Sequence, residues 1–73
     1  MYLPDPDTVL AVNEALEKLA NEDDDSAVIA RLRLFAGMTI DEAADALGCS
    51  RATAYRDWAY AKAWLTTALR EVD

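Results

Sequence analysis

The chain has 73 residues, a net charge of −7 and a single cysteine. This length fits one small domain with a limited core, and one cysteine excludes an internal disulfide. The sequence has no apolar run long enough to span a bilayer and does not begin like a signal peptide, so we expect a cytoplasmic protein with no membrane partner.

The composition predicts an all-α fold. The sequence contains fifteen alanines and only two glycines, and its two prolines, Pro4 and Pro6, both lie within the first six residues. Alanine favours helices, and no proline interrupts the rest of the chain. We therefore expect a flexible N-terminal segment over residues 1–6 and a small four-helix domain over residues 7–73.

The first helix is expected over about residues 7–20. Either Asp7 caps it, or Asp5 does so with Pro6 at the first helical position. Apolar residues recur at helical spacing and predict its inward face: Val9, Val12, Leu16 and Leu19.

The polar residues 21–26, four of them acidic, precede a second helix expected over about 24–36. The acidic run suits a solvated loop or a helix start, and it lacks the glycine and distal glutamate of an EF-hand calcium loop. Gly37 is expected at the C′ position. The predicted inward side chains of this helix are Val28, Ile29, Leu32 and Phe35.

Residues 39–58 have the spacing of a helix-turn-helix. Thr39 and Glu42 fit a capping box at the start of a third helix, and Gly48 fits its end. Ala44 is small enough for two helices to approach closely. The inward residues of the third helix are expected to be Ile40, Ala43, Ala44 and Leu47.

A long fourth helix is expected over about residues 50–72, with Ser50 able to cap it. Cys49 is expected to be a buried thiol between the two helices, and Trp64 to pack against the first helix or a partner. Residues spaced for one inward stripe are Ala54, Trp58, Ala61, Leu65, Ala68 and Val72.

The charge is unevenly distributed along the chain. Residues 1–47 carry eleven acidic and three basic residues, whereas residues 48–73 carry four basic and three acidic ones. The acidic front repels phosphate or faces another protein, and the basic charge lies in the last helix. A DNA-binding helix needs basic charge at this position.

The residue types argue against an enzyme. The chain has no histidine, so it cannot form a Ser/His or Cys/His nucleophile pair or a histidine metal site. Its glycines at 37 and 48 do not form a phosphate-binding loop. We expect no cofactor and no metal.

The helix-turn-helix interpretation places the N-terminal half of the last helix in the DNA major groove. Arg51 and Arg56 can donate to guanine O6 and N7 or to phosphate. Ser50, Thr53 and Tyr55 can contact phosphates or base edges. The alternative is that these are ordinary solvated side chains, and Lys62 is equally suited to a phosphate contact or a solvated face.

The chain resembles region 4 of extracytoplasmic-function (ECF) bacterial sigma factors over about residues 8–70. The motifs that carry the resemblance are an apolar-Arg-x-Phe-x-Gly turn at 32–37, a Thr-x-x-Glu-x-Ala-x-x-Leu-Gly helix at 39–48, and a Ser-x-x-Thr start of the last helix at 50–53. An Ala-Lys-Ala-Trp-Leu tail at 61–65 follows. The two preceding helices and this tail make the resemblance more specific than a bare helix-turn-helix.

The resemblance implies recognition of the −35 element of double-stranded promoter DNA and docking on the β flap of the RNA polymerase core, with an anti-sigma factor as a further partner. The sequence departs from the family pattern at Ala54, where the family usually has Val, and at Tyr55, where it usually has Lys or Arg. Asp57 also adds an acidic residue near the recognition face. Carried over to this sequence, the DNA-binding positions are Ser50, Arg51, Thr53, Tyr55, Arg56, Ala59 and Tyr60.

Two other functions stay open at this point. One is a stand-alone, dimeric helix-turn-helix regulator, and the other is a helix-turn-helix-shaped protein-interaction domain, which the net charge and Tyr55 favour. A sigma factor also has an upstream region 2, so we expect either a domain excised from a longer protein, which we favour, or a stand-alone small protein.

Overall fold

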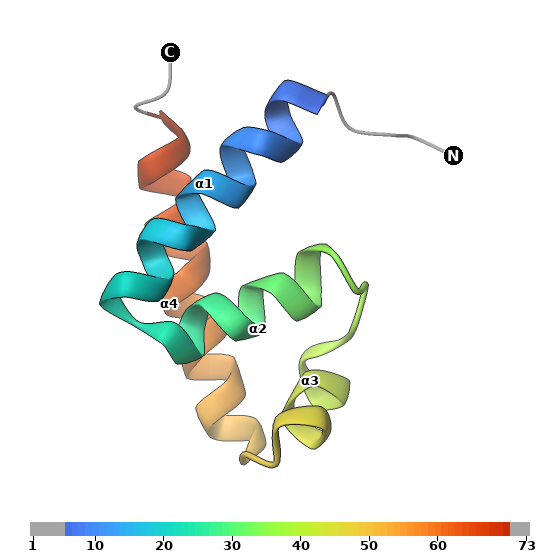
Figure 1. Cartoon of the computed structure of the whole chain (residues 1–73). Coiled ribbons are helices and arrows are strands. Elements are labelled where there is room, and N and C mark those ends of the chain that lie inside the picture. Colours follow the sequence, from blue (N-terminus) through green and yellow to red (C-terminus); the bar gives the residue numbers. More distant parts are fainter. Residues whose placement is uncertain (1–5, 71–73) are drawn as a thin grey trace.

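The computed structural model describes residues 6–70, and these form four helices with no strand (Figure 1). This confirms the predicted all-α class. The expected cap Asp5, most of the predicted N-terminal segment and the last stripe residue, Val72, lie outside the described residues. The helices are α1 (Pro6–Glu22), α2 (Asp24–Leu34), α3 (Ile40–Leu47) and α4 (Arg51–Arg70).

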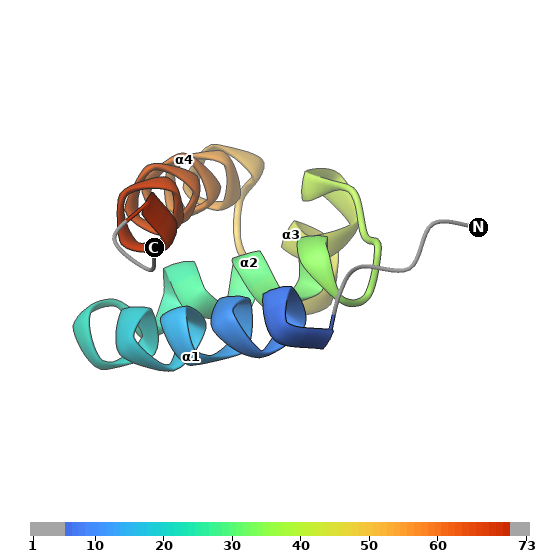
Figure 2. The ribbon, with the colours of Figure 1, turned by 90° about the horizontal axis from the view of Figure 1, so that it is seen from above.

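α2 and α4 each contact all the other helices, whereas α1 and α3 do not touch each other. α4 extends from its start beside α3 to its end beside α1, and α2 lies between these two regions (Figures 1 and 2). The molecule is a flat body of 36 × 31 × 15 Å. α1 thus supports the long α4, and α3 lies at its N-terminal end.

One core cluster joins α1, α2 and α4. Leu16 and Leu19 are fully buried in it, as predicted, whereas Val9 is 37% exposed and its inward assignment is wrong. Val9 lies outside the core because the buried residues of α1 are in its C-terminal half. The buried members are Ala15, Leu16, Leu19, Ala27, Ala30, Ala61 and Leu65.

The acidic run begins α2. Asp23 is its N-cap, and the carboxylate of Asp23 accepts a hydrogen bond of 3.3 Å from the backbone N–H of Ser26. Asp23 is therefore the single residue between α1 and α2. At its other end, α1 begins at Pro6 and has Asp7 in its first turn. Acidic side chains in the first turn favour this arrangement through the helix dipole.

α2 ends two residues earlier than expected. Phe35 is its C-cap and is 51% exposed, which corrects the inward assignment of this side chain. Gly37 has a φ of +70° but lies two residues beyond the cap, so it is not at C′. The buried side chains of α2 are mostly small because α1 and α4 both pack on it: Ser26, Ala27, Ile29 and Ala30.

A second core cluster joins α2, α3 and α4. Its buried members are Ile29, Ile40, Ala43, Ala44 and Ala54. Ala44 and Ala54 are 1% and 0% exposed, which confirms that small side chains fill the contact between α3 and α4. Leu47 is 44% exposed, contrary to the prediction, and Cys49 is only partly buried, because both lie at the edge of this cluster.

The predicted stripe of α4 is confirmed where the structure describes it. Ala54, Ala61 and Leu65 are buried, and Trp58 packs against both clusters. Trp64 packs on the first cluster, and its Nε1 donates a hydrogen bond of 2.9 Å to Oε2 of Glu22 at the end of α1. Within residues 6–70, no helix combines the length and apolar character needed to cross a membrane.

Candidate nucleic-acid interface

α3, the turn after it and the start of α4 form the predicted helix-turn-helix. Gly48 ends α3 in the left-handed conformation, with a φ of +69°, where a side chain would be strained. The N–H groups of Gly48 and Cys49 both donate to the carbonyl of Ala44. This tight turn brings the first residues of α4 back beside α3.

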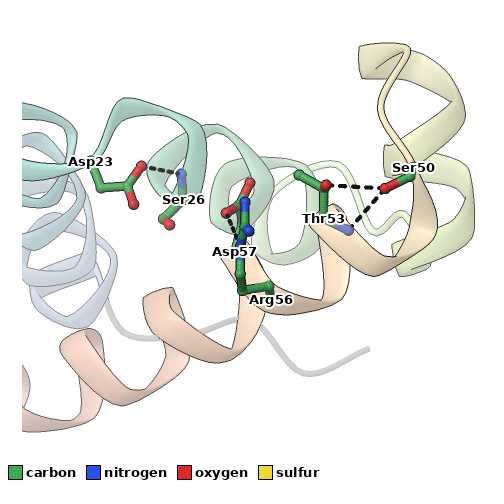
Figure 3. Close-up of polar contacts among 6 residues, drawn as sticks. All are labelled: Asp23, Ser26, Ser50, Thr53, Arg56 and Asp57. Carbon is green, nitrogen blue, oxygen red and sulfur yellow. Dashed lines mark hydrogen bonds and ion pairs between the residues drawn. The ribbon is translucent and has the colours of Figure 1, made fainter.

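Ser50 caps α4 through its hydroxyl. Ser50 Oγ accepts a hydrogen bond of 3.1 Å from the N–H of Thr53 and donates one of 3.0 Å to Thr53 Oγ1 (Figure 3). Thr53 is half-buried, whereas Ser50 is exposed. The two hydroxyls therefore fix the start of the helix and lie at the same end of it.

Arg51 is the first residue of α4, and its side chain is 72% exposed. Its Nε lies 3.5 Å from Oδ1 of Asp41, in the first turn of α3. Acidic side chains are favoured at the positive end of a helix dipole and basic ones are not. The first turn of α4 contains no acidic residue, so its N-terminus and Arg51 together make a positively charged end.

Arg56 is exposed one turn further along α4. Its side chain forms an ion pair with Asp57 (Figure 3), with Nε 3.8 Å from Oδ1. The two side chains are 76% and 11% exposed. Burial raises the pKa of Asp57, Arg56 lowers it, and the nearby carboxylates of Asp23 and Asp25 raise it further. Asp57 is therefore packed toward α2 and does not extend the exposed face as the sequence suggested.

The remaining candidates lie on different sides of α4. At 100° per residue, Tyr55 and Lys62 share the flank of Arg51, whereas Tyr60 lies nearer the opposite flank. Tyr55 and Tyr60 are 54% and 44% exposed. Nζ of Lys62 lies 5.9 Å from the centroid of the Trp58 ring, well beyond the start of α4. The structure thus groups Ser50, Arg51 and Thr53 at one end and separates Tyr60 and Lys62 from them.

The exposed part of α3 is acidic. Asp41, Glu42 and Asp45 lie on this helix, and its capping box is complete, with Thr39 N–H donating to Glu42 Oε1 at 2.9 Å and Glu42 N–H donating to Thr39 Oγ1 at 3.1 Å. The backbone hydrogen bond from Thr39 and the side-chain contact with it lower the pKa of Glu42. α3 therefore presents negative charge beside the positive end of α4.

A groove between α1, α2 and α4 was not predicted. It has a volume of about 240 Å³ and is mostly apolar. Arg33 lies close by, with its guanidinium carbon 5.3 Å from the Trp58 ring centroid. The adjacent large apolar residues Leu34 and Phe35, both exposed in the structure, are a sequence signal that could have indicated it. The lining residues are Val12, Leu34, Trp58, Lys62, Leu65, Thr66 and Leu69.

In the described part of the chain, no three cysteine, aspartate or glutamate side chains lie together in an arrangement that could hold a metal ion. A protein-family model described as "ECF sigma factor" matches residues 1–71 of the chain. No curated protein and no solved structure matches it.

Proposed function

The chain belongs to the ECF sigma factor family, and we propose that it recognises the −35 element of promoter DNA with α4 and docks on the β flap of RNA polymerase. Family membership gives a role in transcription initiation, through RNA polymerase and promoter DNA, and this is not a family of enzymes. The −35 element, the flap and the residues that contact them are the parts we propose.

The observation that carries the DNA-binding proposal is the positive end of α4. An exposed arginine at the first position of a helix opposes the helix dipole, and such departures from local preference are expected at functional sites. A phosphate or a guanine edge supplies further negative potential at this end of the helix, beside the Asp41 carboxylate.

In the proposed complex, α3 crosses the DNA backbone and the N-terminal half of α4 enters the major groove. Arg51 and Arg56 donate to guanine O6 and N7 or to phosphates, while Ser50, Thr53 and Tyr55 contact the backbone or base edges. Between the two arginines, the exposed Ala52 allows the helix to approach the bases closely. Tyr60 lies further along α4 and reaches only the flanking backbone, whereas Lys62 lines the apolar groove.

The apolar groove between α1, α2 and α4 is the surface we propose for the polymerase flap. Leu34 and Phe35 are 49% and 51% exposed beside or within it, which leaves apolar area for a partner to cover. The groove starts about two turns along α4 from Arg51, so DNA and polymerase can bind together. Docking on polymerase raises the local concentration of an acidic domain near DNA.

A capture experiment tests this part of the proposal. The 73-residue chain serves as bait for the core RNA polymerase or its isolated β flap. Leu34→Asp places a charge in the groove, and Leu10→Asp is the matched control, because Leu10 is 56% exposed on α1 and does not line the groove. Capture by the wild type and the control, but not by Leu34→Asp, supports the groove.

Equal capture by both variants contradicts the groove as the docking site. Failure of the wild type to capture polymerase, with DNA binding intact, favours a stand-alone regulator. Failure to bind either DNA or polymerase favours a domain that binds other proteins.

A further inference from the structure

We propose that Asp41 is a positioning residue for Arg51: the carboxylate at the start of α3 holds the guanidinium so that its terminal nitrogens face a base edge in bound DNA. The inference rests on the proposed function, since it concerns how α4 recognises DNA. The geometry that points to it is the contact of 3.5 Å between Arg51 Nε and Asp41 Oδ1.

The backbone of Asp41 is held in place by α3, while its side chain is 46% exposed. This residue follows Ile40, which is 7% exposed, and precedes Glu42 of the capping box. Ala43 and Ala44 on the same helix are 0% and 1% exposed, so α3 is packed into the second core cluster. The carboxylate lies in the first turn of α3, at the positive end of the helix dipole.

Arg51 needs such a fixed partner. An arginine has several rotatable bonds, and ordering it costs conformational entropy on binding. The ion pair with Asp41 runs through Nε, and no side-chain hydrogen bond joins Arg51 to another described residue. The two terminal nitrogens are thus left for the pair of acceptors, O6 and N7, on the edge of a guanine.

The carboxylate has opposite effects on affinity and on selectivity. Its negative charge repels the DNA backbone and lowers the affinity for any duplex. By orienting Arg51 it favours one base over the others, which is a contribution to selectivity. A purely electrostatic role for Asp41 predicts the first effect alone, so the two roles are separable by experiment.

The experiment compares Asp41→Asn with Asp45→Asn. Both substitutions remove one negative charge from α3, and Asp45 is exposed with no ion-pair partner among the described residues. A library of duplexes with a randomised central segment is selected at low salt with the wild type. The affinities of each variant for the selected duplex and for a scrambled duplex then give a selectivity ratio.

We expect Asp41→Asn to lower this ratio about fivefold, within the range of one bidentate arginine–guanine contact. The affinity for the scrambled duplex stays equal or rises. Selection with Asp41→Asn relaxes the preference at the same base positions as selection with Arg51→Ala. In an Arg51→Ala background, Asp41→Asn leaves the ratio unchanged. Asp45→Asn preserves the wild-type ratio.

Equal ratios for Asp41→Asn and Asp45→Asn, with wild-type selectivity intact, overturn the inference and leave the proposed function standing. A wild type that prefers no duplex over the scrambled one overturns both. Matching thermal midpoints for the two variants exclude misfolding of α3 as the cause of a lower ratio.

Discussion

The guanidinium of Arg33 lies over the ring of Trp58, with 5.3 Å between its central carbon and the ring centroid. Nη1 of Arg33 also donates a hydrogen bond of 2.8 Å to the carbonyl of Met38. One side chain from the end of α2 therefore contacts α4 and the segment that leads into α3. These contacts help to set the position of the helix-turn-helix relative to the rest of the domain.

Arg33→Ala is expected to lower the free energy of unfolding by about 1–2 kcal/mol, because a cation–π contact and a hydrogen bond are lost together. Urea unfolding followed by tryptophan fluorescence measures the change. Arg70→Ala, an exposed arginine at the end of α4, removes the same charge and should change stability by less than about 0.5 kcal/mol. Equal losses in both variants would show that the Arg33 contacts do not stabilise the fold.

Leu16→Ala should destabilise the domain by about 2–5 kcal/mol, since Leu16 is fully buried between α1, α2 and α4. The exposed Leu10 on the same helix gives a matched control, and Leu10→Ala should cost less than about 0.5 kcal/mol. Thermal unfolding followed by circular dichroism distinguishes them. Similar midpoints for the two variants would place the core elsewhere.

Glu42→Gln is expected to weaken the acid dependence of stability. The pKa of Glu42 is lowered from 4.5 in the folded protein by the hydrogen bonds with Thr39. Its contribution to stability is therefore present above pH 4.5 and is lost as the pH falls through the folded pKa. Thermal midpoints from pH 7 to pH 3 should fall less in Glu42→Gln than in Glu14→Gln, an exposed control on α1. If the thermal midpoints of the two variants fall in parallel with pH, the Glu42 carboxylate in the capping box does not contribute to the acid dependence of stability.

The contribution of Asp57 to stability has the opposite pH dependence to that of Glu42, and Asp57→Asn tests it. Burial raises the pKa of Asp57 above its ordinary value of 3.8, so the folded state binds the proton more tightly than the unfolded state. The stabilisation that this gives is complete below pH 3.8 and is lost as the pH rises through the folded pKa. Asp57→Asn should therefore be more stable than the wild type at pH 7 and equal to it near pH 3.

Urea unfolding at the two pH values measures this difference, and Asp45→Asn controls for the general relief of negative charge. If Asp57→Asn is less stable than the wild type at pH 7, the ion pair with Arg56 outweighs the cost of burying the carboxylate.

The parts of the fold that depend on local sequence could be predicted. The capping box of Thr39 and Glu42, the left-handed Gly48 and the Ser50 cap are decided within a few residues, and the structure confirms them. The stripe of α4 was also predictable, because it repeats at helical spacing over several turns.

The errors in predicted burial occur where the packing of other helices decides which side chains are covered. Phe35 and Leu47 were predicted inward from their size and spacing, yet both are about half exposed at helix ends. Ser26 is 0% exposed because α2 lies between α1 and α4, where only small side chains fit. A periodic pattern in one helix does not contain this information.

The candidate site was predictable as a list of residues but not as an arrangement. The contacts of Arg51 with Asp41 and of Arg33 with Trp58 join residues on different helices, and the burial of Asp57 depends on how α4 packs beside α2. Lys62 was predicted as either a phosphate contact or a solvated side chain, and the position of its ammonium over Trp58 at the apolar groove could not be read from one helix.

The central claim is that the start of α4 binds duplex DNA, and fluorescence anisotropy with a labelled duplex over a series of salt concentrations tests it most directly. We predict that Arg51→Ala and Arg56→Ala each weaken binding and reduce the slope of log affinity against log salt by about 1, while Arg70→Ala, which removes the same charge, stays close to the wild type. Wild-type affinity and slope in both Arg51→Ala and Arg56→Ala would contradict the claim.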